Sequence, residues 1–176
     1  NISQERLEDC INSDLANNYG NLCQRVTAFT IKNCDGKIPL EVKFNDEDLL
    51  ILNKYKDNLD NIRSQIDNQN INFYIDYIVN SLFEANKYFN DQEPWKKKDN
   101  LIRLNTIVYT TLEIVRKISF LLYPIIPESS LKALKIFNIS ENEINLSSIE
   151  NNEYLLKDSN INKIDILFNK IEKNND

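Results

Sequence analysis

The sequence predicts an all-α protein, an antiparallel helix bundle with a short helical or irregular C-terminal tail. The 176 residues include only two glycines and four prolines, so few turn formers are available for a many-stranded sheet. Apolar residues make up 41% of the chain, which is enough to fill the core of one domain. They recur at steps of three, four and seven residues, the spacing that places side chains on one face of a helix.

The first predicted helix runs from Ser3 to about Cys34. Its apolar stripe consists of Leu7, Ile11, Leu15, Leu22, Val26 and Phe29. Gly36 interrupts this pattern, and residues 37–42 are expected to form an extended connection. A second helix is predicted from Asn45 to about Asn68, because three acidic residues follow Asn45 and negative charge favours a helix N-terminus.

Two further long helices are predicted, from about Asn70 to Asn90 and from Asn100 to Tyr123. The second of these has the strongest apolar stripe of the chain. A short helix should begin at Pro127, because proline is well tolerated in the first helical turn. We therefore expect a bundle over residues 1–137 and a tail over residues 138–176, where Glu, Asn and Ser dominate.

Composition limits the possible functions. The formal charge of −6 has the wrong sign for wrapping nucleic acid by bulk electrostatics, so any RNA contact must be local. Three cysteines without CxxC spacing, and no histidine, predict neither a zinc site nor a disulfide framework, and indicate a reducing intracellular setting. No apolar run is long enough for a membrane span. The absence of methionine, even at position 1, indicates a piece of a longer chain.

Three polar side chains follow one face of the first helix. Asn17, Asn21 and Arg25 are spaced i, i+4 and i+8, at the edge of the apolar stripe. Amide and guanidinium groups held at a core boundary are suited to reading the edge of an unstacked base. In a chain so rich in asparagine, the competing interpretation is that these are ordinary surface amides.

The only tryptophan, Trp95, follows Pro94 just beyond the third helix. An indole at this place is a stacking platform worth about 1–3 kcal/mol per base. Nearby positive charge for phosphates would come from Lys96, Lys97, Lys98 and Arg103. Alternatively, the indole simply caps the bundle and the lysines are solvated.

Three motifs together resemble the anticodon-binding domain of methionyl-tRNA synthetases. Residues 12–25 match Asn-x-x-Leu-Ala-Asn-x-x-Gly-Asn-Leu-x-x-Arg, residues 85–95 match Ala-Asn-x-Tyr followed by a polar run and Pro-Trp, and residues 121–127 match Leu-Leu-x-Pro-x-x-Pro. The chain end, 167–172, resembles the closing Leu-Phe-Pro-Arg/Lys-Ile segment of the family, although Asn169 replaces the usual proline. The resemblance covers nearly the whole chain.

The resemblance implies a site for the CAU anticodon of tRNA-Met. It assigns base stacking to Trp95 and hydrogen bonds with the cytosine and its neighbours to Asn21 and Arg25. Asn17 and Pro94 would support them. The resemblance further implies a cytoplasmic, monomeric methionine-tRNA ligase as the parent protein, with tRNA-Met and its own catalytic domain as partners of this chain.

The resemblance also implies that ATP, methionine and, in some members, zinc belong to that catalytic domain. Its His-x-Gly-His and Lys-Met-Ser-Lys-Ser signatures cannot lie in a chain without histidine or methionine, so we expect this piece to be non-catalytic and without a cofactor. The tail is expected to pack on the bundle or on the catalytic domain. Two alternatives stay open: the anticodon-binding domain of a related class I synthetase, and a helical protein-interaction module without an RNA role.

Overall fold

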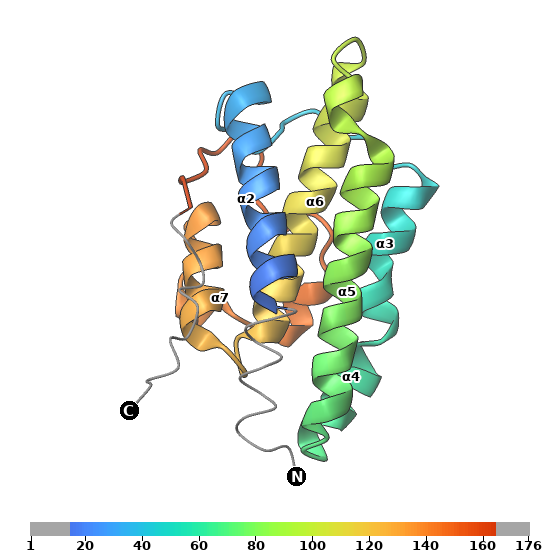
Figure 1. Ribbon diagram of the computed structural model, residues 1–176, viewed down its shortest axis with the longest axis vertical. Helices are drawn as coiled ribbons and strands as arrows, with labels where there is room; N and C mark the ends of the chain where they lie inside the picture. Colours follow the sequence, from blue (N-terminus) through green and yellow to red (C-terminus); the bar gives the residue numbers. More distant parts are fainter. Residues whose placement is uncertain (1–14, 165–176) are drawn as a thin grey trace.

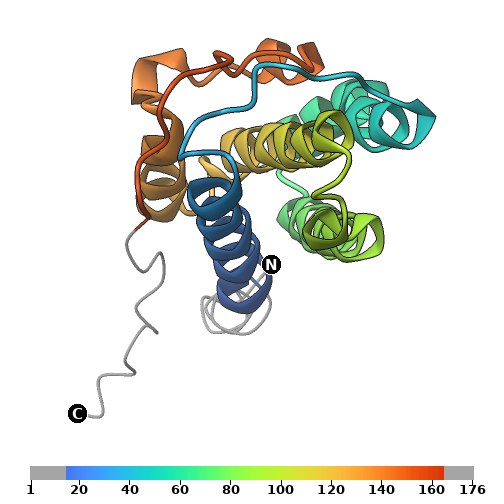
Figure 2. The same cartoon turned by 90° about the horizontal axis from the view of Figure 1, so that it is seen from above.

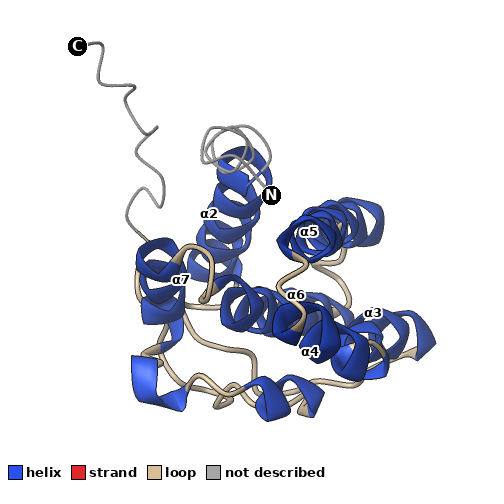
Figure 3. Ribbon diagram, turned by 90° about the horizontal axis from the view of Figure 1, so that it is seen from below, coloured by secondary structure: helices blue, strands red, loops and turns tan. Residues whose placement is uncertain are grey.

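The computed structural model describes residues 15–164, and within this range it contains helices and loops, as Figures 1 and 3 show. The α-helices are α2 (Ala16–Asn33), α3 (Asp46–Asp57), α4 (Leu59–Asp67), α5 (Ile71–Gln92), α6 (Leu101–Leu122) and α7 (Pro127–Leu134). The short 3-10 helices are η2 (Pro94–Lys96), η3 (Lys135–Phe137), η4 (Glu141–Glu143) and η5 (Leu146–Glu150). The predicted all-α class is confirmed.

The long helices form an antiparallel bundle in which α2, α3, α5 and α6 alternate in direction along the long axis (Figure 1). α2 and α5 are not consecutive in the chain, yet they run the same way and pack side by side. This arrangement brings residues near position 25 beside residues near position 90.

Helix α6 is the centre of the bundle (Figure 2). It contacts α2, α3, α5 and α7, and every residue from Thr106 to Leu122 is buried. Two of its buried threonines satisfy their hydroxyls within the helix: Thr106 and Thr111 donate to the carbonyls of Ile102 and Ile107. The sequence predicts a helix with one strong apolar stripe, whereas the structure buries this helix on all sides from Thr106 onward.

The single helix predicted from Asn45 to Asn68 is two helices. Its start is as expected, because Asn45 and Asp48 form a reciprocal capping box. The break comes at Asn58, whose side-chain amide donates to the Lys54 carbonyl at 2.8 Å and so competes with the regular helical hydrogen bond. The backbone of Asn58 departs from the α-helical conformation, so α3 ends before this residue and α4 begins after it.

The chain from 138 to 164 lies against the bundle. Ile149 is fully buried, and Ile139, Leu155 and Ile161 are nearly so. Backbone hydrogen bonds join Ile38 to residues 158 and 159 at 2.7 and 2.8 Å. The beginning of the predicted first helix, before residue 15, and the closing segment 167–172 lie outside the described residues. None of the described helices is both long and apolar enough to cross a membrane.

Candidate nucleic-acid interface

A sharp turn at the end of α5 fixes the position of Trp95. The helix ends at Gln92, and Glu93 adopts a left-handed conformation with φ 47° and ψ 60°. Because Glu93 precedes a proline, the right-handed helical region is disfavoured for it. The left-handed conformation that it adopts costs a residue other than glycine about 1–2 kcal/mol. Pro94 itself is buried. The buried proline and the turn therefore hold the next residue, Trp95, at the surface.

Trp95 is 41% exposed, and its indole rests on a cluster of phenyl rings. Its ring meets the buried Phe89 ring edge-on, with centroids 6.0 Å apart and an interplanar angle of 66°. Phe89 in turn meets Phe29 of α2 edge-on at 5.9 Å. Aromatic pairs prefer this geometry, so the indole is supported from below while much of it stays open to solvent.

Arg25 of α2 reaches the same cluster from the other side. Its guanidinium carbon lies 5.1 Å from the Phe89 ring centroid, within the range of a cation–π contact. Its Nη2 donates to Oδ1 of Asn90 at 2.5 Å. These two contacts orient the guanidinium beside the indole.

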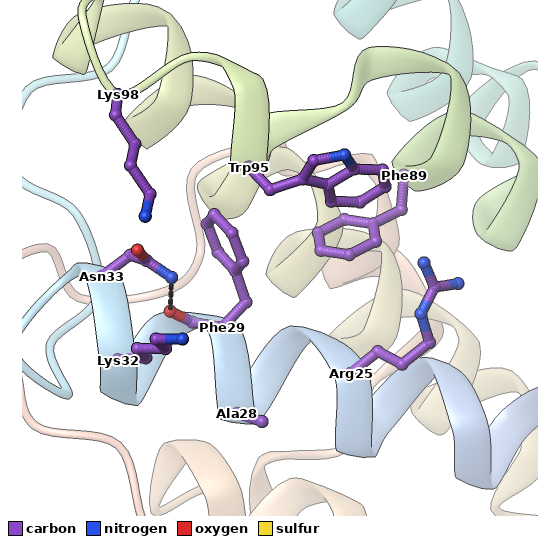
Figure 4. Close-up of a pocket in the computed structure, with 8 residues that line it drawn as sticks. All are labelled: Arg25, Ala28, Phe29, Lys32, Asn33, Phe89, Trp95 and Lys98. Atoms are coloured by element: carbon purple, nitrogen blue, oxygen red, sulfur yellow. Dashed lines mark hydrogen bonds between the residues drawn. The ribbon is translucent and has the colours of Figure 1, made fainter.

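Between α2, the end of α5 and η2 lies a pocket of about 340 Å³ (Figure 4). It is lined by Arg25, Ala28, Phe29, Lys32, Asn33, Phe89, Trp95 and Lys98. Asn33 donates to the Phe29 carbonyl at 3.1 Å, and the lysines lie on the flank away from Arg25. The pocket thus combines an aromatic floor, a guanidinium and two ammonium groups, which suits a planar base with an adjacent phosphate.

Of the predicted site residues, the structure brings Arg25, Trp95 and Lys98 together in this pocket. Asn17 and Asn21 are exposed and line a neighbouring groove of about 430 Å³ between α2 and α5, which Arg25 borders as well. Pro94 is buried, so its contribution to the site is to fix the backbone that precedes Trp95.

The other predicted cations are placed differently. Lys96 is exposed and pairs with Glu93 at 2.7 Å, and Lys97 is half-buried; both lie outside the pocket lining. Arg103 is bound inside the protein: its Nη1 lies 2.7 Å from Oδ2 of the buried Asp48, and its Nη2 donates to Oε1 of Gln92 at 2.7 Å. This guanidinium holds the end of α5, so we leave it out of the phosphate-contacting set.

Asp48 is the centre of this buried network. Besides Arg103, it accepts a hydrogen bond from the Tyr88 hydroxyl and one from the Asn45 backbone. Burial by itself raises the pKa of Asp48, but the hydrogen bonds from Arg103, Tyr88 and Asn45 outweigh it and hold that pKa below its ordinary value. The network ties the N-terminus of α3 to α5 and α6 just below the Trp95 turn.

Sequence reasoning missed the residues that connect the site. The sequence predicts Phe29 only as part of an apolar stripe, and it does not single out Phe89, Asn90, Lys32 or Asn33. A signal existed for Phe89, because it lies directly after Tyr88 of the second motif. Its role as the ring beneath both Arg25 and Trp95 depends on α2 and α5 packing side by side.

The described part of the chain has no cluster of three or more acidic, cysteine or histidine side chains that could hold a metal ion. Cys23 and Cys34 are free thiols within it. Burial raises the pKa of Cys34 to about 11, so this thiol is not activated as a nucleophile.

Comparison with known proteins identifies the family. A family model described as the anticodon binding domain of methionyl tRNA ligase matches residues 38–176. The methionine–tRNA ligase of Brucella suis biovar 1 is 36% identical over 138 residues, 78% of this chain and 27% of that protein. The ligase of Thermotoga maritima is 32% identical over 173 residues, 97% of this chain and again 27% of the relative.

A solved structure agrees with this result. The free-state crystal structure of Mycobacterium tuberculosis methionyl-tRNA synthetase has a TM-score of 0.84 and 30% identity, over 96% of this chain and 35% of that one. The chain spans about a quarter of the length of the two ligases. It belongs to the family of anticodon-binding domains of methionyl-tRNA ligases.

Proposed function

We propose that this chain binds the CAU anticodon of tRNA-Met and so selects the tRNA that a methionine-tRNA ligase charges. The observation that carries the proposal is the pocket in which a 41% exposed indole, Trp95, lies beside the oriented guanidinium of Arg25. Charging itself, with ATP and methionine, would occur in a catalytic domain of the same cytoplasmic, monomeric enzyme. The chain would need no cofactor of its own.

In this proposal each side chain has a separate task. The first base of the anticodon, a cytosine, stacks on Trp95. Arg25 only donates, so it pairs with the acceptor atoms of that base, whereas the Asn21 amide also accepts from the exocyclic amino group. Asn17 supports Asn21 on the same helix face, and Pro94 fixes the backbone before the indole.

Phosphate contacts would come from the lysines around the pocket. Lys98 and Lys32 line it, and Lys96 and Lys97 extend the positive charge along the turn. The net charge of −6 opposes RNA binding over the rest of the surface. We therefore expect a weak, local and base-selective interaction.

A binding titration tests the proposal. The chain is titrated with end-labelled stem-loops that carry CAU or another anticodon, and fluorescence anisotropy of the RNA gives Kd. We expect Trp95→Ala to weaken CAU binding by about 5- to 150-fold, the equivalent of about 1–3 kcal/mol of lost stacking. Phe73→Ala is the matched control, because Phe73 is also 41% exposed but belongs to the first turn of α5 and lies outside the pocket.

Two results would contradict the proposal. One is a wild-type chain that binds all anticodons equally. The other is a Trp95→Ala variant that binds CAU as tightly as the Phe73→Ala control does.

A further inference from the structure

We propose that the groove between α2 and α5 is a second base site, in which Phe83 stacks on the nucleotide next to the base held by Trp95. This inference rests on the proposed function, since it assumes a single-stranded RNA loop at the Trp95 pocket. Its own support comes from the shape, the hydrogen-bonding groups and the charge of the groove.

The groove has a volume of about 430 Å³ and is continuous with the first site through Arg25, which lines both. On α5, Phe83, Asn86 and Asn90 are spaced i, i+3 and i+7 and so share one helix face. Helices α2 and α5 lie side by side (Figure 1), and that face of α5 lines the groove together with Asn17, Asn18 and Asn21 of α2. A nucleotide in this groove would be the immediate neighbour of one in the Trp95 pocket.

Amides dominate the groove. Five of its nine lining residues are asparagines: Asn21, which the proposed function assigns to the cytosine, and Asn17, Asn18, Asn86 and Asn90. Asn86 Nδ2 donates to the carbonyls of Asn18 and Leu82, both at 3.1 Å, so its Oδ1 is the atom that can accept from a ligand. Asn90 Oδ1 accepts from Arg25, so its Nδ2 is left to donate. An acceptor and a donor one helical turn apart complement the edge of a nucleobase.

The charges of the groove favour a base over a phosphate. Of its three charged side chains, Lys87 and Asp91 pair with each other at 2.7 Å. The third, Arg25, is already engaged by Asn90 and the Phe89 ring. A phosphate would lie next to the Asp91 carboxylate without an unpaired ammonium group, whereas a neutral base meets no such repulsion.

Phe83 supplies the stacking surface. It is 62% exposed, one of the most exposed aromatic side chains described, and it stands at the amide-lined groove. A single exposed phenylalanine needs no explanation by itself. Here the ring stands beside hydrogen-bonding groups and borders an aromatic site, which is the combination that single-strand binding proteins use.

The test is a double-mutant cycle between protein and RNA. Wild-type chain, Phe83→Ala and Phe83→Tyr are titrated with the CAU stem-loop and with two stem-loops that lack the base on one or the other side of the cytosine. We expect Phe83→Ala to weaken CAU binding by about 5- to 150-fold and Phe83→Tyr to bind like wild type. With one of the two abasic loops, wild type and Phe83→Ala should bind equally.

The outcomes separate this inference from the proposed function. If Trp95→Ala weakens binding but Phe83→Ala does not, or if its effect persists with both abasic loops, the second site is wrong and the proposed function stands. If the wild-type chain does not prefer the CAU stem-loop, both the proposed function and the second base site are wrong. Phe83 is mostly exposed, so loss of folding is not expected, and the unchanged thermal unfolding of Phe83→Ala is the check.

Discussion

Arg25 Nη2 and Asn90 Oδ1 form a hydrogen bond of 2.5 Å between residues 65 positions apart in the chain. Because the Phe89 ring also lies under this guanidinium at 5.1 Å, the group is held in place before any ligand arrives. Such preorganisation lowers the entropy that binding must otherwise cost. The arginine predicted from the first helix therefore depends on α5 for its position.

Arg25→Gln should reduce discrimination at the first anticodon base. We expect CAU binding to weaken by about 10-fold or more, because charge-assisted hydrogen bonds contribute about 1.5–3 kcal/mol, while stem-loops with another first base change little. Lys32→Gln is the matched control, since it removes one positive charge from the same pocket. Stem-loop titrations check this, and equal losses for every anticodon would assign Arg25 a merely structural role.

The long-range parts of this site could not be read from the sequence. Periodicity placed Asn17, Asn21 and Arg25 on one face, and proline marked the end of the third helix, which stops at Gln92. Both are local effects of backbone geometry. The Phe89 ring under Arg25 follows from the side-by-side packing of α2 and α5, which spacing within either helix does not encode.

The partner of Arg103 is another long-range contact that the sequence does not reveal. Its position one turn into a helix after a lysine run suggested a phosphate contact, but its carboxylate partner, Asp48, lies 55 residues earlier. The break at Asn58 was missed for another reason. In a chain with many asparagines inside helices, the sequence does not distinguish the one whose side chain binds the Lys54 carbonyl.

The lysines around Trp95 should differ in their salt dependence. Lys98 lines the pocket, whereas Lys96 is paired with Glu93. Lys98→Ala should therefore lower the slope of log Kd against log salt concentration by about 0.7, the value for one phosphate contact in single strands. Lys96→Ala should have a smaller effect, and the exposed Lys56 on α3 supplies the neutral control, Lys56→Ala. Equal slopes for Lys98→Ala and wild type would exclude the phosphate contact.

Arg103→Met should destabilise the fold. It leaves the buried Asp48 carboxylate without its cation, which costs about 3 kcal/mol or more in the free energy of unfolding. Lys87→Met also removes one ion pair, but an exposed and solvent-screened one, and should change the stability far less. Urea unfolding of both variants measures the difference, and similar small losses would show that the Asp48 pair contributes little.

The same pair predicts loss of stability in acid. Since the pKa of Asp48 is lower in the folded chain than in the unfolded one, its stabilisation is present above the unfolded value, about 3.9, and is lost as the pH falls through the lower folded value. Urea unfolding of the wild-type chain from pH 6 to pH 2 should show this loss. The corresponding decrease should be smaller in Arg103→Met, where the carboxylate no longer has its main partner.

Lys117 predicts a second pH dependence, which arises because burial disfavours the charged form of this side chain. Its side chain is buried, and its Nζ donates to the Leu52 carbonyl at 3.0 Å and to Oδ1 of Asn152. It thereby joins α6 to α3 and to the chain after η5. Burial, with a smaller contribution from the nearby Arg116 charge, lowers the pKa of Lys117 to about 7.

The unfolded chain keeps this lysine protonated up to a pKa of about 10.4, so between pH 7 and pH 9 it binds more protons than the folded chain does. The free energy of unfolding should therefore rise with pH, by about 2 kcal/mol over this range relative to Lys117→Met, which keeps the length of the side chain but cannot titrate. The comparison must be with that variant, because burial raises the pKa of the Cys23 thiol and gives both proteins a slope of the opposite sign above about pH 8.5. Denaturant unfolding at pH 7, 8 and 9 measures the difference; parallel curves for the two proteins would mean that Lys117 stays charged in the folded bundle.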